Sequence, residues 1–213
     1  MKNYDFFLFD ADGTIIDTME LIYRCFAHTC KKFMDKTVSK TEVQKNVGLT
    51  LRDQMEIYFG PMSGEYFETV RREHMAFQLA HYREHLKAFP TVANGLADLC
   101  AAGKHSAVVT SRKIDTLKLY LKETGLFDFF EVLVTPETTQ KHKPDPEPAL
   151  AALNLLQAPK DRALFVGDSV FDILCASRAG LDSAFVQWSV NDLNELTVHP
   201  TYIIDDFRQL SKL

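Results

Sequence analysis

Short apolar runs that alternate with helical patterns dominate the chain. Six runs have the length of short strands and contain almost no polar residues, which is typical of parallel strands covered on both faces. They span residues 6–9, 107–109, 132–134, 163–166, 184–186 and 202–204. Apolar residues recur at helical spacing over residues 113–124, 146–157 and 170–179. This alternation predicts an α/β fold with a parallel sheet flanked by helices.

Two kinds of residue mark the ends of these helices. Gly125 and Gly180 follow the periodic patterns directly, where a glycine commonly ends a helix. Asp145 and Pro146 precede one pattern, which predicts Asp145 as the N-cap and Pro146 as the first helical residue.

The segment from about Thr18 to Phe89 interrupts the alternation. It shows only helical periodicity and no convincing strand, and Gly48 and Gly60 divide it into pieces. About 70 helical residues between the first and second strands predict an inserted α-helical domain. We therefore expect a core domain of residues 1–16 and 88–213 and an inserted domain of residues 17–87.

Composition narrows the functional classes. The chain has 213 residues, 46% of them hydrophobic and 25% charged, as expected of a globular protein with a full core. A net charge of -5 argues against a nucleic-acid binder that relies on bulk positive charge. No apolar run approaches the roughly 20 residues of a membrane span, and the N-terminus does not resemble a signal peptide. These features predict a cytoplasmic protein without a membrane partner, and a monomer is compatible with them.

The four cysteines are scattered along the chain and form no CxxC pair. Their small number and wide spacing predict free, buried, apolar residues and no disulfide framework. They are Cys25, Cys30, Cys100 and Cys175.

Two carboxylates directly follow the first strand. Asp10 and Asp12 are separated by one residue and followed by Gly13. Ligands of open parallel sheets bind at the carboxyl ends of the strands, where this turn lies. Two such charges about 4 Å apart repel by about 4 kcal/mol at an effective dielectric near 20, and a bound Mg²⁺ would relieve that cost. The structural alternative is a pair of turn-forming aspartates.

A second acidic pair follows the strand at 163–166. Asp168 could supply a further carboxylate to the same metal, and Asp172, one helical turn later, could face the same site. The alternative is that Asp168 caps a helix and Asp172 is solvated.

Two further strand ends carry groups that suit an anion. Thr110 and Ser111 follow the strand at 107–109, where hydroxyl and backbone N–H groups can bind phosphate or can simply cap a helix. Lys143 precedes a proline and could place one positive charge over a phosphate or a carboxylate, although such loop lysines often face solvent. Together with the aspartates, these groups have the composition of a phosphoryl-transfer site.

These motifs resemble those of the haloacid dehalogenase-like hydrolases. The matching segments follow the order of that family and span the whole chain: residues 9–14, 109–110, 143–144 and 167–172. The resemblance implies a Rossmann-like core, and the helical insertion is similar to the C1 cap domain of that family. It further implies a phosphatase of the phosphoglycolate phosphatase-like branch, which also contains pyrophosphatases.

The resemblance also implies roles for individual residues. Asp10 would attack phosphorus and form an aspartyl-phosphate, and Asp12 would act as the acid and then as the base. Mg²⁺ would be held by Asp10, the backbone carbonyl of Asp12 and Asp168, with Asp172 nearby. The transferring phosphoryl group would be bound by Thr110, with Ser111 beside it, and by Lys143, which would also pair with Asp10. The acid at position 12 favours hydrolysis of a phosphate ester or anhydride.

The expected substrate is a small phosphorylated metabolite, such as a phosphoglycolate-like ester or pyrophosphate. Residues 47–52 resemble the cap loop that meets the leaving group, in which Gly48 would permit a tight turn and Arg52 could pair with a substrate anion. Each of these two residues also has a plain structural interpretation.

Two other functions stay open. A sugar-phosphate mutase of the β-phosphoglucomutase type usually has an arginine three residues after this glycine, where the chain has Leu51. A non-catalytic module that binds phosphorylated metabolites would have no need of the acid at Asp12.

One motif is set aside. His81 and His85 match the HxxEH pattern of some zinc proteases, but they lie in a charged helical segment where a solvated face is the simpler interpretation.

Overall fold

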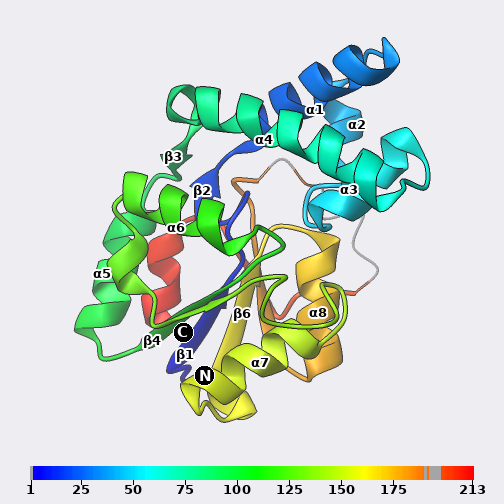
Figure 1. The fold of residues 1–213 in the computed structure, drawn as a ribbon. Coiled ribbons are helices and arrows are strands. Elements are labelled where there is room, and N and C mark those ends of the chain that lie inside the picture. Colours follow the sequence, from blue (N-terminus) through cyan, green and yellow to red (C-terminus); the bar gives the residue numbers. More distant parts are fainter. Residues whose placement is uncertain (1, 190, 192–197) are drawn as a thin grey trace.

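The computed structural model describes residues 2–189, 191 and 198–213. One part contains a sheet with helices on both faces, and helices α1–α4 form a second layer beyond one end of it (Figure 1). The strands are β1 (Phe6–Phe9), β2 (Ile16–Asp17), β3 (Lys87–Ala88), β4 (His105–Val109), β5 (Val132–Val134), β6 (Ala163–Gly167), β7 (Asp182–Val186) and β8 (Tyr202–Ile204). The helices are α1 (Met19–Met34), α2 (Lys40–Gln44), α3 (Leu51–Phe59), α4 (Gly64–His85), α5 (Val92–Ala101), α6 (Ile114–Glu123), α7 (Glu147–Leu156) and α8 (Val170–Ala179). Shorter 3-10 turns are η1 (Phe127–Phe129), η2 (Lys160–Arg162) and η4 (Phe207–Lys212).

The main sheet confirms the predicted parallel α/β core. Its strand order is β5-β4-β1-β6-β7-β8, and every neighbouring pair is parallel. β1 lies near the middle, where Phe9 pairs with Val108 of β4 and Val166 of β6. Because the strands run in one direction, their carboxyl ends meet at a single edge of the sheet.

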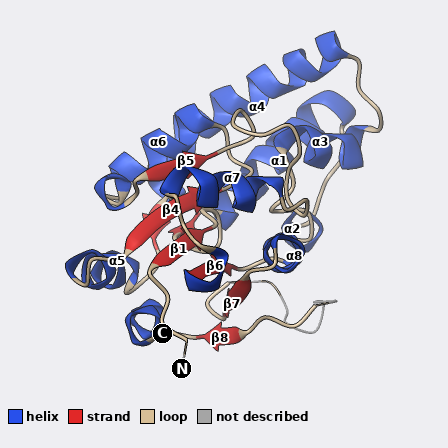
Figure 2. Ribbon diagram, turned by 90° about the horizontal axis from the view of Figure 1, so that it is seen from below, coloured by secondary structure: helices blue, strands red, loops and turns tan. Residues whose placement is uncertain are grey.

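The side chains of β1 alternate between two hydrophobic clusters. Phe7 and Phe9 pack on the face covered by α5, α6 and η4, whereas Leu8 packs on the face covered by α7 and α8 (Figure 2). All three side chains are fully buried. A strand covered on both faces gains from apolar residues at every position, which explains the uninterrupted run in the sequence.

Helices α1–α4 occupy the predicted insertion. They have a hydrophobic cluster of their own, with Phe26, Cys30 and Met55 among its buried members, and α1 packs along α4. The two connections to the sheet lie side by side as the antiparallel pair β2–β3. The prediction that Thr18–Phe89 contains no strand is therefore wrong at β3. The domain boundaries at 17 and 87 stay a prediction.

Three local expectations need correction. α7 begins at Glu147 with Pro146 as its N-cap, and Asp145 instead accepts a hydrogen bond from the Glu147 backbone N–H at 3.0 Å. α5 is a helix that the hydrophobic pattern above does not predict. The cysteines are all free, but Cys100 is exposed rather than buried because it lies on the outer side of α5.

None of the helices in the described part of the chain combines the length and the apolar composition that crossing a bilayer requires.

Candidate active site

A tight turn after β1 places two carboxylates at the carboxyl edge of the sheet. The backbone N–H of Asp10 still donates to Val166 at 2.9 Å, so Asp10 is held by the neighbouring strand β6. The chain then turns around the Ala11 carbonyl, which accepts the backbone N–H groups of residues 14, 15 and 16. Gly13 has a φ of 92°, in the left-handed region that favours glycine.

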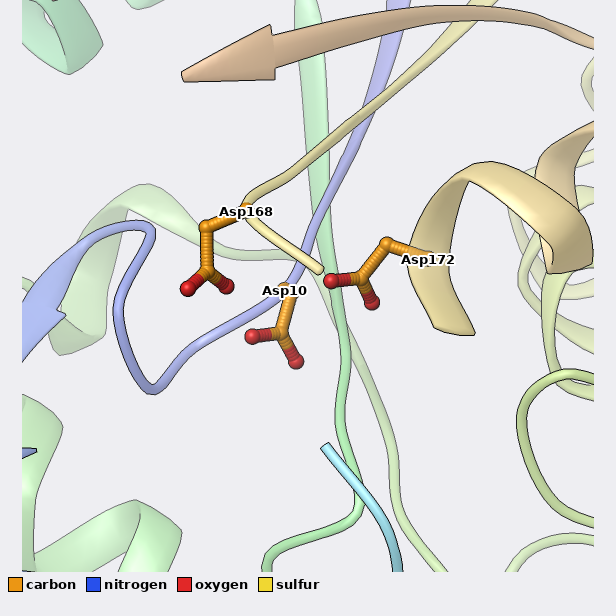
Figure 3. Close-up of side chains that lie close together, drawn as sticks. All are labelled: Asp10, Asp168 and Asp172. Atoms are coloured by element: carbon orange, nitrogen blue, oxygen red, sulfur yellow. The ribbon is translucent and has the colours of Figure 1, made fainter. Parts of the chain in front are cut away.

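Three carboxylates converge at this edge. Asp10, Asp168 and Asp172 each offer one oxygen, and these oxygens lie within 4.8 Å of one another. Figure 3 shows Asp10 and Asp168 at the ends of their strands and Asp172 reaching in from α8. A Cβ on Gly13 would lie 2.2 Å from Asp168 Oδ2, and one on Gly167 would lie 2.4 Å from Asp172 Cβ. Both glycines are therefore needed for the carboxylates to come this close.

Lys143 joins two of these carboxylates. Its Nζ donates to Asp10 Oδ1 and to Asp172 Oδ1, each at 2.6 Å, and its side chain is 1% exposed. Burial raises the pKa of Asp10 well above its usual value, although the charge of Lys143 opposes that rise. Burial acts to lower the pKa of Lys143, but the charges of Asp10 and Asp172 outweigh it and raise that pKa. The lysine is thus held protonated beside Asp10.

Three side chains donate hydrogen bonds to Asp168, and all three are uncharged. Thr14 Oγ1 donates to Oδ1 at 3.2 Å, and Ser189 Oγ and Asn191 Nδ2 donate to Oδ2 at 2.6 and 2.9 Å. Burial and then the charge of Asp172 raise the pKa of Asp168 to about 7.

Asp172 is fixed by the start of its own helix. Ser169 is the N-cap of α8, and its backbone N–H and hydroxyl both donate to Asp172 Oδ2 in a capping box. The cap is therefore Ser169 rather than Asp168, and Asp172 is fully buried rather than solvated. Both alternatives considered for this pair are wrong.

The donor set fits a hard divalent cation. The ammonium group of Lys143 pairs with two of the three buried carboxylates, Asp10 and Asp172, and Asp168 has no cationic partner in the described structure. Mg²⁺ prefers carboxylate oxygens, so the chemistry of the cluster suits it. The Asp12 carboxylate is not part of the cluster, and metal binding through its backbone carbonyl stays a prediction.

The Asp12 side chain is engaged elsewhere. Arg112 Nε donates to Asp12 Oδ2 at 2.9 Å, and Arg112 Nη2 donates to Oδ1 at 2.6 Å. Thr18, the residue before α1, donates to the same Oδ1 at 2.5 Å. The guanidinium also lies over the Tyr120 ring, 4.4 Å from its centroid. Arg112 thus forms a two-point ion pair with a predicted catalytic carboxylate.

A cavity of about 390 Å³ opens above Asp10 and Asp12, between the sheet edge and helices α1, α3 and α4. Thr110 and Ser111 line it from the core side, and Gly48 and Arg52 line it from the helical side. Ser111 Oγ donates to the Gly48 carbonyl at 2.5 Å, which ties the two sides together. Gly48 has a φ of 110°, and a Cβ there would lie 2.8 Å from the Phe171 ring. The expected tight turn is present at Gly48.

Three residues on the helical side differ in what they offer a ligand. Arg52 donates to Glu56 at 3.1 Å and to the Met62 carbonyl at 2.9 Å, so its pairing with a substrate anion stays a prediction. Gln54 is 9% exposed, and its Oε1 has no hydrogen-bond partner in the described structure. Burial lowers the pKa of His74 to about 3, which keeps the imidazole neutral. His81 and His85 are not among the residues that line the cavity.

Arg112 and the residues that hold Asp168 are not predicted from the sequence. Arg112 follows Thr110 and Ser111 at a strand end, so its position could have drawn attention to it. Ser189 and Asn191 follow β7 in a loop without a motif, and no local signal distinguishes them.

The chain is similar to known proteins over nearly its whole length. The family model for haloacid dehalogenase-like hydrolases matches residues 7–186. The PpaX protein of Caldanaerobacter subterraneus subsp. tengcongensis is 38% identical over 207 residues, which is 97% of this chain and 92% of that protein. Pyrophosphatase PpaX of Anoxybacillus flavithermus is 33% identical over 98% of this chain and 95% of its own length.

Solved structures share the fold. A haloacid dehalogenase-like protein from Bacteroides fragilis superposes with a TM-score of 0.90 at 25% identity, covering 98% of this chain and all of that one. CbbY from Rhodobacter sphaeroides in complex with phosphate has a TM-score of 0.82 at 21% identity, covering 97% and 96% of the two chains.

Proposed function

The chain belongs to the haloacid dehalogenase-like hydrolase family, and on that premise we propose that it is a Mg²⁺-dependent phosphatase that works through an aspartyl-phosphate on Asp10. The observation that carries the proposal is the pairing of Asp10 with the buried Lys143 beside the acidic cluster, below the cavity. A carboxylate is a weak nucleophile, and a site that fixes its direction and neutralises the incoming phosphate makes it effective.

Asp10 is the nucleophile in this scheme. Lys143 holds Oδ1, which leaves the other oxygen to attack phosphorus. As the new oxygen–phosphorus bond forms, the bond between phosphorus and the leaving oxygen breaks. Thr110, 7% exposed at the end of β4, would hold the transferring group together with Lys143, with Ser111 beside it. Attack by water on the same phosphorus then releases phosphate and restores Asp10.

Asp12 supplies and removes the protons. Once protonated and free of its present partners, it donates its proton to the leaving oxygen; as a carboxylate it takes a proton from the attacking water. It lines the same cavity as Asp10, within the same turn.

Asp10 and Asp168 would hold the Mg²⁺ ion, with the Asp12 backbone carbonyl as a third ligand and Asp172 behind them. When bound, the ion would neutralise charge on the phosphoryl oxygens and orient the Asp10 carboxylate. We further propose that residues 17–87 form a cap domain whose loop at Gly48 and Arg52 faces the leaving group.

Pyrophosphate is the first substrate we propose, with a phosphoglycolate-like ester as the alternative. The similarity to pyrophosphatase PpaX over nearly the whole chain supports it. The cavity suits a small ligand, and Arg112 adds a cation beside Asp12.

The test is phosphate release from pyrophosphate, phosphoglycolate, hexose phosphates and nucleotides, with Mg²⁺ and with a chelator. We expect release from a small phosphorylated compound that the chelator abolishes, and a loss of at least about 10³-fold in Asp10→Asn. The matched control is Asp161→Asn, an exposed aspartate on η2. Undiminished turnover in Asp10→Asn would refute the mechanism. An isomerised product without free phosphate would indicate a mutase, and binding without turnover would indicate a non-catalytic module.

A further inference from the structure

Both oxygens of the Asp12 carboxylate already accept hydrogen bonds from protein side chains. Arg112 occupies Oδ2 and shares Oδ1 with Thr18, at distances between 2.5 and 2.9 Å. In the mechanism above, Asp12 must present one oxygen to the leaving group and carry a proton there. Three of the roughly four acceptor sites of the carboxylate are taken, and the departure of Arg112 would open Asp12 to the leaving group.

A substrate with a second anionic group can offer Arg112 an alternative partner. Its side chain is 9% exposed and lines the cavity that contains Asp10 and Asp12. The leaving group of a phosphoryl group on Asp10 points towards Asp12, and so towards the guanidinium. A second phosphoryl or carboxylate group there offers oxygens in the forked geometry that a guanidinium matches. A neutral alcohol offers no such group.

Two other arginines that line the cavity are placed differently. Arg52 is bound to Glu56 and to the Met62 carbonyl, and Arg71 is bound to Glu68. Neither contacts a predicted catalytic group in the described structure. Arg112 is the cavity cation that is paired with the predicted acid.

We propose that Arg112 is a specificity-determining residue that selects substrates with an anionic leaving group. A second anionic group on the substrate exchanges places with Asp12 on the guanidinium, and Asp12 is thereby released to serve as acid and base. A substrate with a neutral leaving group leaves the ion pair intact and Asp12 occupied. This inference rests on the proposed phosphatase function and deepens it, because it favours diphosphates and phosphorylated acids over simple esters.

The test compares pyrophosphate with glycerol 2-phosphate, which releases a neutral alcohol. In Arg112→Gln we expect kcat/KM for pyrophosphate to fall by about 10- to 100-fold, the effect of losing one hydrogen-bonded charge contact. Most of that loss should be in KM, and kcat/KM for glycerol 2-phosphate should stay level or rise. Arg112→Lys keeps the charge without the fork and should lie between wild type and Arg112→Gln. The control Lys118→Gln removes an exposed charge from helix α6, which begins two residues after Arg112, and should change neither value.

A binding measurement keeps this inference separate from the proposed function. Methylenediphosphonate carries two phosphoryl groups on a bridge that resists hydrolysis, and calorimetry gives its affinity without turnover. We expect Arg112→Gln to weaken its binding by about 10-fold or more, with Arg112→Lys again intermediate. Thermal melting identifies any variant that does not fold. If Arg112→Gln does not fold, Arg112→Lys is compared with wild type instead.

The possible results distinguish the role of Arg112 from the proposed phosphatase function. Equal losses on both substrates, or unchanged diphosphonate binding, would overturn the role of Arg112 even if the enzyme is a phosphatase. If the wild type released phosphate neither from these two compounds nor from any other member of the panel above, the proposed function would fail, whereas the diphosphonate result would still report on Arg112.

Discussion

Replacing Asp168 with asparagine should stabilise the metal-free protein while weakening its response to Mg²⁺. Asp168 is buried beside Asp172, and none of its three hydrogen-bond donors is a cation. The amide of Asp168→Asn has nearly the same shape. Its oxygen can keep the bonds from Ser189 and Asn191, while its NH₂ group faces the Thr14 hydroxyl, which can rotate to accept. The substitution therefore removes a buried charge without removing a contact.

The size of the effect follows from the pKa of Asp168. A rise from 3.8 to about 7 means that the ionised form costs the folded state about 4 kcal/mol. The pKa of Asp168 is higher in the folded protein than in the unfolded protein. Its contribution to the free energy of unfolding is therefore fully present below pH ~4 and is lost as the pH rises through ~7. The loss accumulates at about 1.4 kcal/mol per pH unit across this interval. Asp168→Asn does not titrate, so its advantage over wild type should grow from pH 4 to 7 and then stay constant.

The assay is thermal and urea unfolding in chelator at pH 5 and pH 8. At pH 8 we expect Asp168→Asn to gain at least about 2 kcal/mol, or at least about 4 °C in Tm, and at pH 5 a clearly smaller gain. Adding Mg²⁺ should raise the Tm of wild type more than that of the variant, because a ligand at free concentration L that binds only the folded state stabilises it by RT ln(1 + L/Kd), which is larger for the tighter site. Asp161→Asn serves as the exposed control and should show neither effect.

Two results would refute this reasoning. If Asp168→Asn were no more stable than wild type in chelator at pH 8, the buried charge would not be a cost in the folded protein. If the gain were the same at both pH values, it would arise from packing rather than from ionisation. An unchanged response to Mg²⁺ would remove Asp168 from the metal site.

Two further predictions concern the groups around the same cluster. Lys143→Met leaves Asp10 and Asp172 without their shared cation, so it should lower the free energy of unfolding by about 3–5 kcal/mol at pH 7.5 in urea titrations. Mg²⁺ should restore part of that loss, and a variant as stable as wild type in chelator would show that the ion pairs contribute no net stability. Gly13→Ala places a Cβ at a φ of 92° and 2.2 Å from Asp168 Oδ2, so calorimetry should show Mg²⁺ affinity reduced at least about 10-fold. Wild-type affinity in Gly13→Ala would mean that the turn can shift without disturbing the site.

The sequence predicted most of the core because the evidence for it is local. A strand buried on both faces needs apolar residues throughout, so residues 6–9 or 163–166 can be recognised without any knowledge of their neighbours. The pair β2–β3 was not predicted, because the evidence for it is not local. Each of these strands has two residues, and their pairing joins Ile16 to Ala88 across the whole helical insertion. Only folding brings those residues together, so no local pattern reveals them.

For the candidate site, too, some of the evidence is local and some depends on long-range contacts. Asp10 and Asp12 stand together in one turn, and Asp168 and Asp172 stand one helical turn apart, so each pair can be found in a short stretch of sequence. The parallel sheet then predicts that the two pairs meet, since the ends of parallel strands share an edge.

Local patterns along the chain were thus enough to predict the fold class, the family resemblance and the set of charged groups in the site. The tertiary structure decided which of those groups face one another. It placed Lys143 between Asp10 and Asp172, Arg112 on both oxygens of Asp12, and Ser189 against Asp168. Strand and helix patterns arise from neighbouring residues, whereas an ion pair depends on distances of a few ångströms between residues that can be far apart in the sequence. Lys143 and Asp10, for example, are separated by 133 positions.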